Sequence, residues 1–335
     1  MPSFFPKDGV FYKASLHCHT NISDGKLTPA QIKEAYVAQG YAAVAFTDHE
    51  VFLTHNDLTD DGFVALNGYE TAIKQCPGEH TGSFHLAYHL NLIARSADER
   101  VQPFADPRVL TPGNCRAHFN AENCRELLSY EFSPAGVNSL IRRAQAAGFF
   151  VTYNHPAWSM IPLSDYGRLE GLDGIEVMNT GAFANGDCSG LPLGELLRLG
   201  QRVLPIGGDD NHNDHGFTDS FGGFTMLCAR GGLSYASLIG ALEHGWSYVS
   251  CGPKIYDIGY EGDRLYIRTS PATRIILLSE GRYARAVDGD GITEAYFDRA
   301  PAKTGSLIRF EVVDARGARA ISRGYFSDEF EGNES

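Results

Sequence analysis

The sequence predicts an α/β fold that carries a small β-rich module at its C-terminal end. Short apolar, β-branched or aromatic runs alternate with helix-like segments up to about residue 250, and such alternation is typical of a parallel sheet. The number of these units favours a barrel over a small open sheet. After about residue 253 the pattern changes to short alternating strands separated by Gly, Asp and Pro turns. We therefore expect two domains, residues 1–253 and residues 254–335.

Cap and turn residues mark the elements of the first domain. Residues 11–17 form the first expected strand. Residues 28–40 form a helix that is capped by Thr28, has Pro29 in its first turn and ends at Gly40. A helix at residues 133–148 repeats this punctuation. The remaining strands are expected at residues 41–49, 62–70, 88–94, 149–156, 171–179 and 202–212, and the remaining helices at residues 191–200 and 234–245.

Two further segments carry weaker patterns. Segment 95–132 is rich in Arg, Pro and Asn, and we expect it to be an insertion with a short helix at residues 123–130. In the C-terminal module, residues 312–320 place a polar turn between two strand-like runs, which predicts a hairpin. The module is expected to contain antiparallel strands and no helix.

Composition and charge argue against several classes of protein. The chain of 335 residues has a net charge of −13 and no Lys or Arg run, so nucleic acid is not expected as a stable partner. Its seven scattered cysteines contain no CxxC pair, which argues against a disulfide framework or thiolate zinc site and indicates the reducing cytoplasm. There is no signal-peptide pattern, and no apolar run approaches the roughly 20 residues that cross a bilayer, so no membrane partner is expected. The sequence leaves a homo-oligomer open.

Polar residues, mainly histidines and carboxylates, end or follow five of the expected strands, and a sixth strand, residues 88–94, carries His89. Because parallel strands deliver their ends to one face of a barrel, these side chains are expected to meet there. Alternate residues of a strand share a face, so His17 and His19 point the same way, as do Asp210 and His212. A mixed set of imidazoles and carboxylates suits Zn²⁺, Mn²⁺ or Fe, whereas oxygen ligands alone would suggest Mg²⁺ or Ca²⁺. The residues concerned are His17, His19, Asp48, His49, Glu70, His89, Asn154, His155, Asp209, Asp210 and His212.

Each of these residues also has an ordinary reading. An isolated His-x-His pair is more often structural, and Asp24 before Gly25 is most simply a turn residue. Asp48 and His49 could be a helix cap beside a surface imidazole. If no metal is bound, the polar residues of six strands need six separate explanations, whereas one polynuclear metal site explains them together. We therefore favour the metal site.

The chain resembles the PHP (polymerase and histidinol phosphatase) family over about residues 11–253. The resemblance rests on the motifs HCHTNISDG, FTDHE, GYE, YHLNLIA, NHP and GGDDNH, which follow one another in the order of the family. It implies a distorted TIM-like barrel of seven β/α units, a (β/α)7 fold, that holds two or three divalent metal ions (Zn, Mn or Fe). Within the family, the sequence resembles the stand-alone metal-dependent phosphoesterases most strongly. It also resembles the branch that contains aryl-carbamate hydrolases.

Carried over by position, the resemblance also implies a set of ligands. His17, His19, Glu70 and Asp210 would hold the first metal, and Glu70 would bridge to a second metal bound by His89 and His155. Asp24, His49 and His212 would hold a third metal or serve proton transfer. His85 is an alternative to His89, and Asp209 is an alternative to Asp210. Asp209 replaces the usual serine, and its charge could alter metal choice or bind a substrate cation.

The predicted function is hydrolysis of a small phosphomonoester or phosphodiester by a metal-activated hydroxide, with a small phosphorylated molecule as substrate. Asp48, His49 and His212 are the candidates for protonating the leaving group. One alternative is an amide, carbamate or carboxylic-ester hydrolase that uses the same site, and another is a non-catalytic metal-containing binding protein. The candidate substrate contacts are Lys26, Arg95, Trp158 and His215, each of which is also readily explained as a surface or packing residue.

Overall fold

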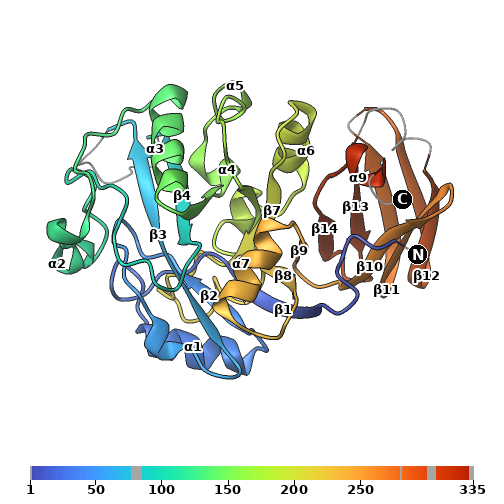
Figure 1. Cartoon of the computed structure of the whole chain (residues 1–335), viewed down its shortest axis with the longest axis horizontal. Coiled ribbons are helices and arrows are strands. Elements are labelled where there is room, and N and C mark those ends of the chain that lie inside the picture. The colour runs from blue at the N-terminus through green and yellow to red at the C-terminus, as the bar shows by residue number, and fades with distance from the viewer. Residues whose placement is uncertain (1, 77–84, 280, 300–306, 332–335) are drawn as a thin grey trace.

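The structure is a computed structural model that describes residues 2–76, 85–279, 281–299 and 307–331 (Figure 1). Within these residues, fifteen strands belong to one sheet, whose main order is β10-β11-β13-β14-β9-β8-β1-β2-β3-β4-β5-β6-β7. The strands are β1 (Val10–Ser15), β2 (Ala43–Phe46), β3 (Val64–Lys74), β4 (Ala87–Ala94), β5 (Phe149–Tyr153), β6 (Gly174–Asn179), β7 (Leu204–Gly208), β8 (Phe224–Ala229), β9 (Ser247–Ser250), β10 (Ile255–Glu261), β11 (Arg264–Ser279), β12 (Ala284–Asp298), β13 (Leu307–Val313), β14 (Arg319–Ser322) and β15 (Tyr325–Phe326).

Helices lie mainly between the strands of the first part of the chain, as the alternating pattern predicts. Three of them begin at a side chain that caps the first turn: Thr28 before α1, Ser133 before α3 and Ser234 before α7. The α-helices are α1 (Pro29–Ala38), α2 (Cys115–His118), α3 (Pro134–Ala146), α4 (Pro156–Ser159), α5 (Leu163–Tyr166), α6 (Leu191–Arg198), α7 (Tyr235–Glu243) and α9 (Asp328–Glu331), and the 3₁₀ turns are η1 (Asn56–Leu58), η2 (Ala121–Asn123) and η3 (Phe183–Asn185).

The α/β class with parallel strands is confirmed, but the strands do not form a closed barrel. β1, β2 and β3 are parallel to one another, and so are β5, β6 and β7, whereas β4 runs antiparallel to both β3 and β5. The end of β7 and the residues just after it still lie beside the end of β1, where Gly207 O accepts from Leu16 N at 3.3 Å and His17 O accepts from Asp210 N at 3.0 Å. This contact brings the two ends of the predicted metal site side by side.

The C-terminal part is rich in strands, as predicted, and its sheet is continuous with the first part. β8 and β9 were not among the expected strands; β9 pairs with β14, and β8 pairs with β1. One hydrophobic cluster contains Phe46, Tyr248 and Ile308, so it draws on both sides of residue 253. In Figure 1 the N-terminal residues also reach the C-terminal strands, and Phe4 stacks on Tyr325 there. The division at residue 253 therefore stays a prediction.

The helix expected at residues 123–130 is wrong, and the hairpin expected at residues 312–320 is confirmed. Residues 123–130 do not form the expected helix, because their backbone pairs in an extended form with residues 102–105: Glu126 O accepts from Ala105 N at 2.9 Å, and Ala105 O accepts from Leu128 N at 3.0 Å. The hairpin at residues 312–320 is present, with Val313 opposite Arg319. Among the residues that the structure describes, no helix is long and apolar enough to span a membrane.

Candidate metal centre

The histidines and carboxylates predicted as ligands converge on one cavity of about 330 Å³. Seven of the nine predicted ligands line it, and the other two, His17 and His19, are fully buried beneath it. Trp158, Lys74 and the loop Thr111–Gly113 form much of the remaining wall. The seven ligands that line the cavity are Asp24, His49, Glu70, His89, His155, Asp210 and His212.

Glu70 of β3 lies at the centre of the cluster and is completely buried. Its Oε1 lies 3.1 Å from His89 Nδ1, 3.2 Å from His155 Nε2 and 3.3 Å from His17 Nε2. Its Oε2 lies 3.0 Å from His49 Nδ1. The two oxygens of one carboxylate thus face histidines on opposite sides, an arrangement that suits a carboxylate shared by two cations.

His17 and His19 share one face at the end of β1, as the His-x-His spacing predicts. Their Nε2 atoms are 3.2 Å apart. Asp210 Oδ1 lies 2.9 Å from His19 Nε2 and 3.3 Å from His17 Nε2. These three residues and Glu70 form one of the groups whose ligand atoms all lie within 4.8 Å of one another.

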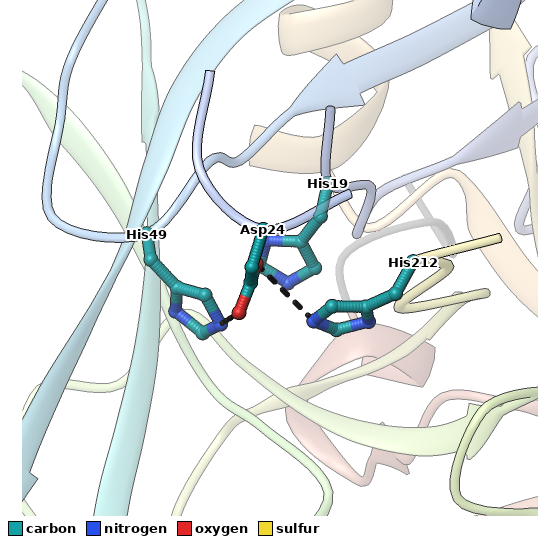
Figure 2. Close-up of side chains that lie close together, drawn as sticks. All are labelled: His19, Asp24, His49 and His212. Carbon is teal, nitrogen blue, oxygen red and sulfur yellow. Dashed lines mark ion pairs between the residues drawn. The ribbon is translucent and has the colours of Figure 1, made fainter. Parts of the chain in front are cut away.

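A second such group contains Asp24, His49 and His212 together with His19 (Figure 2). Asp24 lies between the other side chains: its Oδ2 is 3.7 Å from His49 Nε2, and its Oδ1 is 3.4 Å from His212 Nε2. The carboxylate of Asp48 accepts from Thr20 N at 2.7 Å and from the Ser23 hydroxyl at 2.7 Å. Asp48 therefore holds the loop that presents Asp24.

Several atoms of the cluster are buried without a hydrogen-bond partner in the described part of the chain. They include Glu70 Oε2, Asp24 Oδ1, His49 Nδ1 and both ring nitrogens of His89. Buried polar atoms are normally paired, because each unpaired one carries a desolvation cost. Lone pairs of imidazole and carboxylate that converge within a few ångströms fit divalent cations of the zinc, manganese or iron type.

The electrostatics favour the cation-binding charge states of the carboxylates Glu70 and Asp210, of His19 and of His89. For His17, His49 and His155 the neighbouring carboxylates outweigh burial and raise the pKa, which favours the protonated ring in the absence of a metal. Burial raises the pKa of a carboxyl group, but the surrounding histidines outweigh burial and hold the pKa values of Glu70 and Asp210 well below their usual range. Burial lowers the pKa of His89 to about 4, so its ring is neutral at pH 7 and has a lone pair free for a metal. In contrast, Asp24 and Asp210 outweigh the burial of His212 and raise its pKa to about 10.

Glu176 of β6 supports the cluster and was not predicted. Its Oε1 lies 3.2 Å from His17 Nδ1, and its Oε2 accepts from His155 N at 3.0 Å. Asn154 Nδ2 donates to Glu70 Oε1 at 2.8 Å. Carboxylates and amides that bond to ligand side chains fix the orientation of those ligands. A single charged residue inside the apolar run GIEVMN was the signal that could have identified Glu176.

Backbone strain accompanies two of the ligand residues. His155 has a φ of 26° and Asp210 has a φ of 52°, both in the region that side-chain-bearing residues rarely adopt. Strain of this kind is concentrated at functional sites, where the surrounding structure imposes it. Asp210, rather than Asp209, faces the cavity. Asp209 is instead buried behind it and accepts hydrogen bonds from the hydroxyls of Tyr36 and Thr180.

The candidates for substrate contact are distributed differently from the ligands. Trp158 lines the cavity, with its ring 4.9 Å from that of His155 and 5.2 Å from that of His89. Lys26 is exposed and pairs with Asp214 at 2.9 Å, and His215 is also exposed. Neither of these two residues lines the cavity.

Arg95 is remote from the cavity because β4 runs antiparallel to its neighbours. The end of β4 therefore points away from the ends of β3 and β5, and Arg95 forms ion pairs there with Asp173 and Glu243. The same reversal explains why His89, near the start of β4, reaches the site. The cavity contains His89 and not its alternative His85.

Gly208→Ala is expected to displace His17 and to weaken metal binding by about 10- to 100-fold, the range seen when the support of a ligand is lost. A Cβ atom at this position would lie 2.6 Å from His17 Cβ and 2.7 Å from His17 N, closer than atoms can approach. Titration with Mn²⁺ monitored by calorimetry measures the effect. Gly240→Ala, at a helical position with open space around it, is the control and should bind metal normally. Equal affinity in the two variants would contradict the expected displacement.

Glu50→Gln is expected to change how the stability of the metal-free protein depends on pH. Burial raises the pKa of Glu50 from 4.5 to about 8, although Ala72 N and the Thr71 hydroxyl donate to its carboxylate. Between these two values the folded protein holds a proton that the unfolded chain has lost, so rising pH destabilises the wild type by up to about 1.4 kcal/mol per unit. Glutamine has no such proton. Urea unfolding at pH 5, 6.5 and 8 should therefore show that the free energy of unfolding of the variant rises relative to that of the wild type as the pH rises. A difference between the two proteins that stays constant with pH would refute this.

Comparison with protein-family models and with curated proteins gave no match. Three solved structures follow a similar chain path. One is a two-domain protein containing a predicted PHP-like metal-dependent phosphoesterase from Bacteroides vulgatus, with a TM-score of 0.42 and 14% identity over 95% of this chain and 96% of that chain. Another is a candidate metal-dependent phosphoesterase from Bifidobacterium adolescentis, with a TM-score of 0.37 and 19% identity over 62% and 89% of the two chains. The third is an amidohydrolase from Chromobacterium violaceum with bound sulfate and no metal, with a TM-score of 0.37 and 17% identity over 59% and 87%.

Proposed function

We propose that this protein is a metal-dependent hydrolase that acts on small phosphate esters. The central position of Glu70 carries the proposal, because its two carboxylate oxygens face His17, His89 and His155 on one side and His49 on the other. This is the arrangement that a cluster of two or three cations requires. The motifs that resemble the PHP family contain these same residues and support the same conclusion.

The ligand set would divide between the cations as follows. His17, His19, Asp210 and Glu70 would hold one ion, and Glu70 with His89 and His155 would hold another. Asp24, His49 and His212 would hold a third ion or serve proton transfer. Divalent ions bound there would lower the pKa of water and offset the negative charge of a phosphoryl group.

His212 is the best candidate for the proton donor. Its Nδ1 lies 3.0 Å from Asp210 O, and its Nε2 lies 3.4 Å from Asp24 Oδ1, so an oxygen faces each ring nitrogen. Its raised pKa, about 10, keeps the second proton on the ring at neutral pH, where the oxygen of a leaving group could take it. This role needs the group of Asp24, His49 and His212 to remain free of a cation. Asp48 is a weaker candidate, because its oxygens already bind the Thr20–Ser23 loop.

The same residues could serve hydrolysis of an amide, carbamate or carboxylic ester, because an activated water can also attack a carbonyl group. We prefer the phosphate ester because the motifs resemble most strongly those of the stand-alone metal-dependent phosphoesterases. A non-catalytic binding protein is the third candidate. The gathering of all nine ligands argues against it, since a degenerate site would have lost some of them.

The test is a substrate panel with protein loaded with Mn²⁺, Zn²⁺ or Fe²⁺. The panel contains phosphomonoesters, phosphodiesters, carboxylic esters, carbamates and amides, and metal-free protein is the control. Turnover restricted to phosphate esters and dependent on metal is the expected result. Turnover of the carbonyl compounds alone would move the assignment to the second candidate, and tight ligand binding without any turnover would favour the third.

A further inference from the structure

Lys74 occupies an unusual place at the end of β3. Glu70, Ala72 and Lys74 alternate along the strand and all line the cavity, so they share one face. The neighbouring strand β4 places His89 opposite Ala72 and Ala87 opposite Lys74. Ala72, which lies between Glu70 and Lys74 on this face, has a small side chain and leaves space between the lysine and the ligand cluster.

Most of the Lys74 side chain is buried, but its ammonium nitrogen is not among the buried polar atoms that lack a partner, and the residue lines the cavity. The residue is 8% exposed, and no ion pair or side-chain hydrogen bond joins its ammonium group to another residue in the described part of the chain. Lysine is rarely buried to this degree unless it is paired, because an isolated ammonium is costly to remove from water. Among the described residues of the cavity wall, Lys74 is also the sole lysine or arginine.

Glu50 is close enough for the charge of Lys74 to act on its carboxyl group, but the two residues form no ion pair within the described part of the chain. Its carboxylate already accepts from Ala72 N at 2.6 Å and from the Thr71 hydroxyl at 2.8 Å. The ammonium group thus has no ion-pair partner among the described residues, and it lies in the wall of a substrate-sized cavity.

Lys74 lies four residues along β3 from Glu70, the centre of the ligand cluster. Four residues of strand correspond to about 13 Å between the Cα atoms of Glu70 and Lys74. A phosphoryl group held by ions at Glu70 would therefore lie at one end of the cavity, with the lysine at the other. We propose that Lys74 binds a second anionic group of the substrate, a carboxylate or phosphate distant from the ester that is cleaved. This rests on the proposed function and narrows its substrate class to small phosphate esters with two anionic groups.

The experiment compares two esters that differ in one group. 3-Phosphoglycerate carries a carboxylate where glycerol 3-phosphate carries a hydroxymethyl group, and both have the same phosphate-ester linkage. Release of phosphate is measured with Mn²⁺-loaded wild type, Lys74→Met and Lys74→Arg. Lys33→Met is the matched control, because Lys33 lies on α1 and pairs with Asp60 away from the cavity. Metal content and melting temperature are measured for every variant.

The expected result is that the wild type prefers 3-phosphoglycerate by about tenfold to 100-fold in kcat/KM, the range for one charge-assisted hydrogen bond. Lys74→Met should lose this preference, mainly through a higher KM for 3-phosphoglycerate. Lys74→Arg should retain part of the preference, and Lys33→Met should retain all of it. A Lys74→Met variant that loses activity equally on both esters, or that keeps the preference, overturns the proposal.

A binding measurement separates this proposal from the proposed function. If neither ester is hydrolysed, the phosphoesterase assignment fails, and calorimetry with 4-phosphonobutyrate and propylphosphonate on the Mn²⁺-loaded protein decides the role of Lys74. Tighter binding of 4-phosphonobutyrate to the wild type, lost in Lys74→Met, supports the anion site. Equal binding of the two compounds, or no binding of 4-phosphonobutyrate, overturns it.

Discussion

Glu70→Gln is expected to abolish hydrolysis and most metal binding while leaving the fold intact. The two residues have nearly the same shape, but the amide removes the negative charge that His17, His49, His89 and His155 surround. A loss of about 1,000-fold in kcat/KM is expected, which corresponds to about 4 kcal/mol of transition-state stabilisation. Elemental analysis of the purified variant and phosphate-ester turnover measure the two effects.

Glu50→Gln is the matched control for Glu70→Gln. Glu50 is about as deeply buried as Glu70, and its carboxylate accepts a hydrogen bond from Ala72 N of β3. It does not line the cavity. Because burial already keeps much of its carboxyl group protonated at pH 7, glutamine resembles its native state, and activity should be retained. Full metal content and turnover in Glu70→Gln would show that Glu70 is not a ligand, and loss of activity in both variants would point to a general effect on β3.

Loading with Mn²⁺, Zn²⁺ or Fe²⁺ is expected to stabilise the protein strongly. A ligand that binds only the folded state at 1,000 times its Kd adds about 4.1 kcal/mol, and each further ion adds its own contribution. Relief of the buried and unpaired atoms of Glu70, His49 and His89 is the physical source of this stabilisation. Urea unfolding with chelator and with each metal measures it, and metal-free protein should also be inactive.

Two controls make the stability result specific. Ca²⁺ prefers oxygen ligands, so it should stabilise the histidine-rich site much less than Mn²⁺ does. His17→Asn should lose most of the gain from Mn²⁺, whereas His118→Asn, at an exposed position on α2, should keep it. Equal unfolding curves with chelator and with all three metals would exclude the proposed centre.

The clustering of the ligands could be predicted because strand geometry constrains it. The two-residue period of a strand places His17 and His19 on one face, and parallel strands bring Glu70 to the same end of the sheet. All nine predicted ligands fall in the groups that could hold a metal. This part of the site depends on local spacing and on strand direction, both of which leave a pattern in the sequence.

The errors have a common origin in strand direction and strand length. The sequence pattern does not reveal that β4 is antiparallel, so Arg95 was expected at the wrong end of the sheet. The third strand was expected to stop at Glu70, whereas β3 continues to Lys74, and this hid the alternation of Glu70, Ala72 and Lys74. Glu176 was missed because it lies inside a strand, and only the tertiary structure brings it to His17.

His155 and Asp210 have a left-handed backbone, so at each position the residue that is best for stability differs from the residue that is best for activity. Glycine would adopt these φ values freely, yet it would remove the ligand atom, so the protein retains a strained residue that costs on the order of 1–3 kcal/mol at each position. Selection for a more stable chain alone would favour glycine there, and selection for activity would oppose it. Screens for thermostable variants of this protein that do not also select for turnover would therefore tend to erode its metal centre first.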